Sequence, residues 1–449
     1  MKTVFKNRML ALILLAVFVI SLLSACQGSQ PANTTAAPTQ AATQAATQAA
    51  TTAAPAPAGK TEIDFWNGFA GPDGKQMENI VSAYNNANSS YNVTMQIIQW
   101  GEYWEKITAG AQSGILPEVG VVHFDDITKF AKLGVLNPID DLMNTMGLTD
   151  SDYPPGYMEK SIVDGKRYGV PYDFHPVVMF YNKKLLAEAG VDVPKTGEEF
   201  IDACLKITKG DVYGTAVPVA DNAFMRPIFT RTLLYQFGGT ELNPDGKTYA
   251  FNSAAGEQAL QWLVDLIFKY KVAPEDLEDM IDLFNSNKAG FIFTGPWQIL
   301  GFEENSELDY GVAEMPLIGS NRIVWSGSHQ LVKPVKKTTT EENAAADDFI
   351  TYLIENNIEW AKAGQVPALN RARESAEFKA LDKLVPIAAE FDYIKLPENY
   401  PWYSDGYAYI FHREFMPALT GEISVKEALD NAVDYCNQMT AELVEKFEG

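Results

Sequence analysis

From Thr61 onward, segments with a strand pattern alternate with segments with a helix pattern, and this alternation restricts the fold strongly. The first strand, TEIDFWNGF, alternates apolar residues and ends at a turn at Asn67-Gly68. Helical spacing follows in GKQMENIVSAYNNAN, and the same order repeats in YNVTMQIIQW and GEYWEKITAGAQSG. A third strand, PEVGVVHFDD, closes on two carboxylates. Because strands that alternate with helices form parallel βαβ units, we expect an α/β fold.

The length of this body predicts two hydrophobic cores. About 390 residues follow residue 60, which is too many for one ordinary core. Further along, Thr196 is predicted to cap a helix, with Glu199 completing a capping box. The Asp-Gly of ELNPDGKTYAFNS predicts a hairpin, and KAGFIFTGPW predicts a buried strand followed by a turn. We expect two α/β units between which the chain crosses several times.

Residues 1–60 differ in composition from this body. A basic start with Lys2, Lys6 and Arg8 precedes an apolar run, which is the layout of a secretory signal peptide over residues 1–25. The quartet Leu-Ser-Ala-Cys ending at Cys26 resembles the bacterial lipobox, which implies cleavage before Cys26 and acylation of its thiol. Residues 26–60 consist mainly of Ala, Thr, Gln and Pro, and we expect a disordered tether that carries the lipidated Cys26.

The charge and the cysteines exclude some partners and leave one question open. A net charge of −23 argues against nucleic acid and anionic lipid surfaces as partners. Besides Cys26, the chain has Cys204 and Cys436, both in helical patterns, and we expect two buried free thiols. A disulfide between them stays possible, because sequence gives no distance.

The common catalytic motifs are missing from the sequence. There is no G-x-S-x-G, H-E-x-x-H, P-loop or G-x-G-x-x-G pattern, and the four histidines lack metal-ligand spacing. The stretch from His123 to Asp126 is a weak cation candidate. We therefore predict no catalytic residue, no cofactor and no metal site. A surface glycosidase stays open as an alternative, because paired carboxylates are close in space and not in sequence.

Several stretches taken together resemble a known family. They are IDFWNG, GEYWEKITAGAQSGILPEV, DGKRYGVPYD, FYNKKLLAEAGVDVPKTGEEF, KAGFIFTGPW, DYGVAEMP, GSHQLVKP and AGQVPA. Their order and spacing resemble the extracellular solute-binding proteins of family 1, the maltose-binding-like sugar receptors of ABC importers. The resemblance covers the body from Thr61 on. It implies a monomer with two α/β lobes that close by a hinge on a mono- or oligosaccharide and deliver it to permease subunits with an associated ATPase.

The resemblance also implies lobe boundaries. The first lobe would hold residues 61–172 and 313–364, and the second would hold residues 173–312 and 365–449. The crossings would lie near Val170–His175, Tyr310–Pro316 and Gln365–Pro367. The receptor would be lipid-anchored at the outer face of the bacterial cytoplasmic membrane, and it would catalyse no reaction.

Candidate ligand contacts follow from residue type and from the resemblance. A sugar site needs aromatic faces for the ring and fixed polar groups for the hydroxyls. Of eight tryptophans, Trp100, Trp104, Trp262 and Trp360 lie in helical patterns that favour the core, whereas the others lie at strand ends or turns. The resemblance points above all to the tryptophan of the GPW turn. The predicted contacts are Trp66, Asp126, Asp173, His175, Arg226, Trp297, Trp325, His329, Trp402, Tyr403 and Tyr407.

Structural alternatives apply to several of these residues. Asp125 or Asp126 would serve equally as a helix N-cap, His175 as a hinge residue and Arg226 as a surface ion pair. Arg226 and His329 also raise a second ligand class, because some relatives bind glycerol phosphates and a cation would meet the phosphate.

Overall fold

The computed structural model describes residues 59–217, 225–408 and 410–448. The signal peptide, Cys26 and nearly all of the tether lie outside the described residues. The side chains of Arg226 and Tyr407 lie outside them as well. Across the described ranges, no helix combines the length and the apolar content that a bilayer crossing requires.

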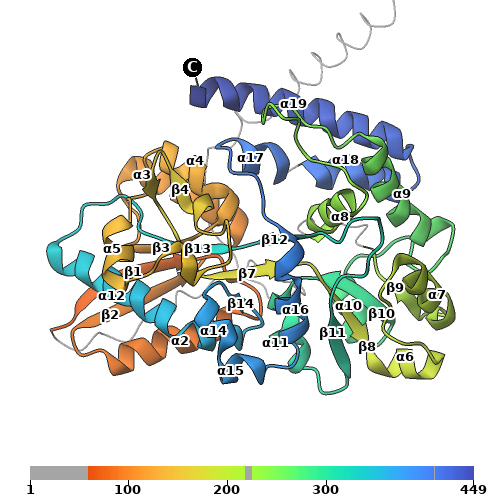
Figure 1. The fold of residues 1–449 in the computed structure, drawn as a ribbon, viewed down its shortest axis with the longest axis horizontal. Helices are drawn as coiled ribbons and strands as arrows, with labels where there is room; N and C mark the ends of the chain where they lie inside the picture. Colours follow the sequence, from red (N-terminus) through yellow and green to blue (C-terminus); the bar gives the residue numbers. More distant parts are fainter. Residues whose placement is uncertain (1–58, 218–224, 409, 449) are drawn as a thin grey trace, which may run out of the picture. The chain divides into compact units, whose positions relative to one another are not determined.

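The first lobe is built on a five-stranded sheet with the order β2-β1-β3-β13-β6 (Figure 1). Its strands are β1 (Thr61–Asn67), β2 (Tyr91–Ile97), β3 (Val119–His123), β6 (Val170–Pro171) and β13 (His329–Val332). The first three are mutually parallel as predicted, while β13 runs antiparallel to β3 and β6. Its helices are α2 (Gly74–Ala87), α3 (Trp100–Ser113), α4 (Ile127–Lys132), α5 (Asp140–Met146), α12 (Thr340–Glu355) and α13 (Asn357–Ala361).

Both faces of this sheet are covered. Successive residues of β1 point to opposite faces, and each face packs against a helix. Phe65 packs edge-on against Phe349 of α12, with ring centroids 5.2 Å apart. On the other face, Trp66 joins a core cluster with Tyr103 and Ile107 of α3. A strand that is buried on both faces explains why apolar residues are nearly continuous toward the end of β1.

The second lobe is built on a four-stranded sheet with the order β11-β8-β10-β9. Its strands are β8 (Val178–Asn182), β9 (Tyr213–Thr215), β10 (Ala289–Thr294) and β11 (Tyr310–Ala313). Its helices up to β11 are α6 (Lys183–Ala189), α7 (Gly197–Ile207), α8 (Met225–Gln236), α9 (Ala254–Phe268), α10 (Met280–Asn285) and α11 (Ile299–Glu303). Those after residue 365 are α14 (Asn370–Glu374), α15 (Ala376–Lys379), α16 (Val385–Ala389), α17 (Tyr403–Ala408), α18 (Ile410–Leu419) and α19 (Val425–Glu448).

A third sheet, with the order β14-β7-β12-β15, contains the segments in which the chain passes between the lobes. Its strands are β7 (Asp173–Pro176), β12 (Val324–Gly327), β14 (Val366–Pro367) and β15 (Ile394–Lys395). Strand β7 leads from β6 of the first lobe to β8 of the second, and β12 leads back into β13 (Figure 1). We refer to this four-stranded sheet as the hinge sheet.

The hinge sheet corrects one predicted crossing. We expected the chain to return to the first lobe near Tyr310–Pro316, but β11 pairs with β8 inside the second lobe. Leu317 still exchanges backbone hydrogen bonds with residues 195–197, and Ser320 donates to the carbonyl of Gln236. The return therefore lies at β12, and residues 313–323 belong with the second lobe.

Local signals were largely sound, with two differences in detail. The Thr196 hydroxyl caps α7 by accepting the Glu199 amide at 3.2 Å, but the Glu199 carboxylate accepts the amide of Lys195 instead of closing the capping box. The Asp-Gly hairpin is reduced to one bridge between Leu242 and Tyr249. The thiols of Cys204 and Cys436 are both free and buried, as expected.

Candidate functional site

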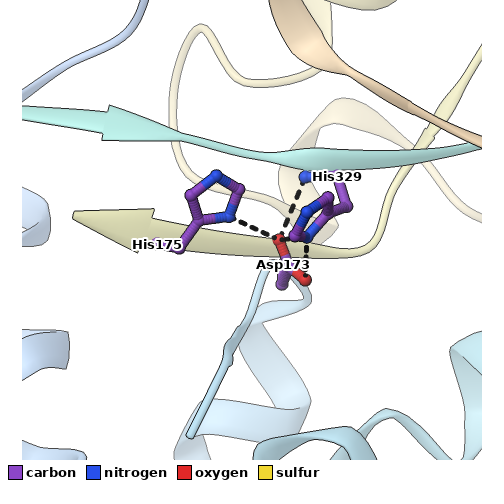
Figure 2. A group of neighbouring side chains, drawn as sticks. All are labelled: Asp173, His175 and His329. Atoms are coloured by element: carbon purple, nitrogen blue, oxygen red, sulfur yellow. Dashed lines mark hydrogen bonds and ion pairs between the residues drawn. The ribbon is translucent and has the colours of Figure 1, made fainter. Parts of the chain in front are cut away.

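Asp173 is the centre of a polar cluster in the hinge sheet. Its side chain is fully buried, and it accepts a hydrogen bond from the indole Nε1 of Trp360 at 2.6 Å and from the amide of His329 at 3.0 Å. The Nδ1 atom of His329 lies 2.8 Å from Oδ2, and Nδ1 of His175 lies 3.3 Å from Oδ1 (Figure 2). Burial by itself would raise the pKa of Asp173, but His329 and His175 hold it below its usual value. The carboxylate is therefore ionised.

Three strands bring the histidines together. Asp173 and His175 are alternate residues of β7, so their side chains share one face of the strand. His329 begins β13 and is paired in register with His123 at the end of β3. The ring of His329 lies 4.4 Å from that of His175 and 5.3 Å from that of His123, centroid to centroid. Burial lowers the pKa of His329 and of His123 below the ordinary value, which favours neutral imidazoles.

Trp297 lies beside this cluster, on the turn that follows β10. All six residues of β10 are buried, and Phe293 stacks on Phe229 at 4.4 Å, which anchors the strand in the second lobe. The indole folds back over Gly295, where an added Cβ would come within 1.9 Å of the ring. The half-buried indole meets the His175 ring edge-to-face at 5.7 Å. The GPW sequence thus places a partly exposed aromatic ring at the hinge, because only glycine leaves room for it.

Three other predicted aromatic contacts are buried. Trp66, Trp325 and Trp402 are between 3 and 5% exposed. Trp402 stacks on Tyr400 and donates its Nε1–H to the Gly246 carbonyl at 2.9 Å, so its face and its polar atom are both used within the fold. Trp325 differs from Trp402, because its Nε1, like that of Trp66, is buried without a hydrogen-bond partner among the described residues. Of these three indoles, Trp325 is the one with an unused donor near His175.

Two tryptophans that the helical pattern assigned to the core lie in the same neighbourhood. Trp100 and Trp104 are partly exposed and stack on each other at 5.1 Å. Trp100 also stacks on His329 at 5.7 Å with an interplanar angle of 9°. Both belong to α3 at positions i and i+4, a spacing that puts two residues on one helix face and was available in the sequence as a signal. Trp360 was correctly assigned to the core, since it is fully buried.

Asp126 forms a buried ion pair with Lys129 in the first lobe and contacts α17 of the second lobe through Ser404. Its Oδ1 lies 2.7 Å from Nζ of Lys129 and accepts the Ser404 hydroxyl at 2.7 Å. Lys129 also contacts Asp405 of α17 at 2.8 Å. Burial opposes the charge, but Asp126 and Asp405 raise the pKa of Lys129 above its usual value. The alternative role as N-cap is not realised, because Asp126 precedes α4 without a capping hydrogen bond from its side chain.

Asp125, on the same turn, has a different environment. It is half-buried, and burial together with the charge of Asp126 raises its pKa to about 6.

Tyr403 belongs to a second buried charge group in the second lobe. Its hydroxyl donates to the Glu241 carboxylate, and Nε of Arg231 lies 3.4 Å from the same carboxylate. Burial raises the pKa of Glu241, while Arg231 opposes this shift. The Arg231 guanidinium also faces the Trp325 and Tyr403 rings, each at 5.6 Å, and so connects this group with the hinge sheet.

A cavity of about 660 Å³ lies elsewhere, between α9 and the start of α19. It is lined by Phe237, Trp262, Gln258 and Lys426, among others. None of the predicted contacts is among the residues that line this cavity.

Comparisons with known proteins agree with this architecture. A family model described as "Bacterial extracellular solute-binding protein" matches residues 79–386. A binding protein of Brucella abortus is 24% identical over 55% of this chain, and the match spans 61% of that relative, which is less than two thirds of its length. The maltooligosaccharide ABC transporter solute-binding lipoprotein of Streptococcus pneumoniae is 23% identical over 75% of this chain and 80% of its own.

Solved structures share the fold at low sequence identity. The Listeria monocytogenes ABC substrate-binding protein in complex with cycloalternan has a TM-score of 0.74 and 23% identity over 85% of this chain and 99% of its own. UgpB of Mycobacterium tuberculosis in complex with glycerophosphocholine has a TM-score of 0.75 and 18% identity over 86% and 100%. The expected two-lobed α/β fold is confirmed, and the chain belongs to the bacterial extracellular solute-binding proteins.

Proposed function

We propose that this protein is the substrate-binding lipoprotein of an ABC importer and that its ligand is a mono- or oligosaccharide. The ligand binds between the two lobes beside the hinge sheet, and the closed form delivers it to permease subunits with an associated ATPase. Acylated Cys26 holds the chain at the outer face of the cytoplasmic membrane, and residues 26–60 act as the tether. The protein catalyses no reaction.

The observation that carries the sugar assignment is that two buried cations near the hinge sheet, Lys129 and Arg231, are paired with protein carboxylates, while Arg373 donates to backbone carbonyls of the hinge region. Lys129 lies between Asp126 and Asp405, and Arg231 lies beside Glu241. A phosphate or carboxylate ligand needs cations that are not already neutralised by protein carboxylates. Among the described side chains around this site, the paired charges favour a neutral solute.

The partly exposed groups suit a sugar. Trp297 is a partly exposed indole, and an aromatic ring face packs on the C–H surface of a pyranose, while Trp100 and Trp104, which stack on each other, form the aromatic surroundings. Asp125 and His123, which are also half-buried, are polar groups of the kind that bind hydroxyls. The sugar-binding names of several relatives support the same class of ligand.

A calorimetric titration with a panel of mono- and oligosaccharides tests the proposal. Trp297→Ala should weaken binding of the best sugar about 10- to 100-fold, because the stacking face is lost. Trp262→Ala is the matched control, since it removes a half-buried indole that lines the separate cavity, and it should leave the affinity unchanged. If no carbohydrate binds, or if both variants bind as wild type does, the sugar site is elsewhere or absent.

A glycerol phosphate type of ligand is the second candidate, supported by the fold similarity to the glycerophosphocholine complex. Glycerol 3-phosphate and glycerophosphocholine belong in the same titration, and tight binding of either one without sugar binding would replace the main proposal. Incubation with chromogenic glycosides tests the glycosidase alternative, because steady turnover would contradict a pure receptor.

A further inference from the structure

Asp173, His175 and His329 form a buried cluster of side chains that are all of a metal-binding type. Nδ1 of His329 and Nδ1 of His175 lie 3.0 and 3.3 Å from the same oxygen, Oδ1 of Asp173. One ligand atom from each residue lies within 4.8 Å of the others. Figure 2 shows the two neighbouring rings beside the carboxylate, each with its Nδ1 atom directed toward it. Two imidazole nitrogens and one carboxylate oxygen thus surround one small volume.

The carboxylate is fixed by groups that would not themselves bind an ion. The Trp360 indole donates to Oδ2 at 2.6 Å, and the His329 amide donates to Oδ1 at 3.0 Å. Metal-binding carboxylates and imidazoles are commonly oriented by such supporting hydrogen bonds, which hold the ligand atoms in place before the ion arrives.

We propose that Asp173, His175 and His329 bind a divalent transition-metal ion of the Zn²⁺ type. Two imidazole nitrogens with one carboxylate oxygen suit Zn²⁺ and its neighbours, whereas Ca²⁺ and Mg²⁺ prefer sites built from oxygen. Three protein ligands leave one position of a tetrahedral set for water or another small ligand.

Because of where these ligands lie, a bound ion would link two segments of the chain that cross between the lobes. His175 belongs to β7 and His329 to β13, directly after β12, so the ion connects segments at two crossings between the lobes. Both histidine residues are buried, so the ion enters when the hinge opens. This inference goes beyond the proposed sugar binding and does not depend on it.

The test uses untagged mature protein that has been stripped with a chelator and titrated with ZnCl₂ in a calorimeter. We expect one ion per chain, no comparable binding of MgCl₂ or CaCl₂, and an absorption band from tetrahedral Co²⁺ when CoCl₂ is the probe. His175→Gln should weaken Zn²⁺ binding by about 100-fold or more. His123→Gln, which changes the neighbouring ring but none of the three ligands, should bind Zn²⁺ as wild type does.

Circular dichroism of each stripped variant shows whether it is folded before the titration. If His175→Gln is misfolded, Asp173→Asn replaces it, since the asparagine keeps the shape and loses the charge. Absence of Zn²⁺ binding by the wild type overturns the proposal, as does equal binding by wild type and a folded ligand variant. Sugar binding by the stripped protein is measured separately, so failure of one proposal is distinguishable from failure of the other.

Discussion

Asp73 is a buried carboxyl group whose protonation should affect stability. It is 5% exposed, precedes α2 and accepts a hydrogen bond from Nε2 of Gln365 at 3.0 Å. Burial, with a further contribution from the charge of Asp173, raises its pKa to about 6. Gln365 opposes the shift but does not cancel it.

The magnitude follows from the difference between the two pKa values. A rise of about 2 pH units from the ordinary aspartate value corresponds to about 3 kcal/mol of unfolding free energy. Between about pH 4 and pH 6 the folded chain holds a proton that the unfolded chain releases. Ionisation of Asp73 therefore lowers stability progressively as the pH rises through this window, and the loss is complete above it.

Asp73→Asn isolates this contribution, because the amide oxygen can still accept from Gln365 while the charge is gone. The free energy of unfolding is measured with urea and tryptophan fluorescence. The difference between the variant and the wild type should grow in favour of the variant by about 3 kcal/mol between about pH 4 and pH 8. Asp192→Asn, at an exposed position, is the control and should show no comparable gain. A wild-type and variant difference that does not change with pH would refute the reasoning.

Three further substitutions test the packing and the charges. Lys129→Met leaves Asp126 buried without its cation, so we expect a loss of about 3 kcal/mol in urea unfolding and partial recovery in the double variant with Asp126→Asn. Gly295→Ala should displace the Trp297 indole and reduce sugar affinity at least about tenfold by calorimetry, with unchanged affinity contradicting the proposed platform. Phe293→Ala should lower stability by about 3 to 5 kcal/mol, and a loss below about 1 kcal/mol would show that β10 is not anchored there.

The local elements of the fold were predictable because their signals lie within a few residues. The alternation in β1, the helical spacing in α2 and the glycine after α3 each depend on neighbours in sequence. The GPW turn belongs to the same class, since Gly295 and Trp297 are two residues apart. Parallel pairing of β1 with β2 and β3 followed from the order of the elements.

The second crossing, which the resemblance implied, was misplaced, and the residues around it do not say which sheet a strand joins. Gly311 and Pro316 mark a break in the chain, but β11 finds its partner in β8, more than a hundred residues earlier. Crossing at β12 depends on pairing of Ser326 and Gly327 with β7, which no local pattern encodes.

Burial differed from expectation for several tryptophans for the same reason, although Trp360 was correctly assigned to the core. Trp66 alternates with Phe65 on a strand that is covered on both faces, so its position at a strand end did not leave it exposed. Trp100 lies on the face of α3 that packs against His329, but this face is covered only partly, so the Trp100 side chain stays partly exposed. Secondary structure fixes the direction of a side chain relative to its own element, whereas exposure depends on what the other elements cover.

The hinge cluster shows where sequence reasoning is weakest and structure is most informative. Asp173 and His175 were singled out, but their relation to His329 and Trp360 spans about 150 residues or more and arises only when β7, β13 and α13 meet. In the same place Trp297 packs against His175, so the His175 ring contacts both the predicted stacking residue and the Asp173 carboxylate. Trp297 and the strands that cross between the lobes therefore meet at His175, so we expect a substitution at Asp173 to alter the packing of Trp297.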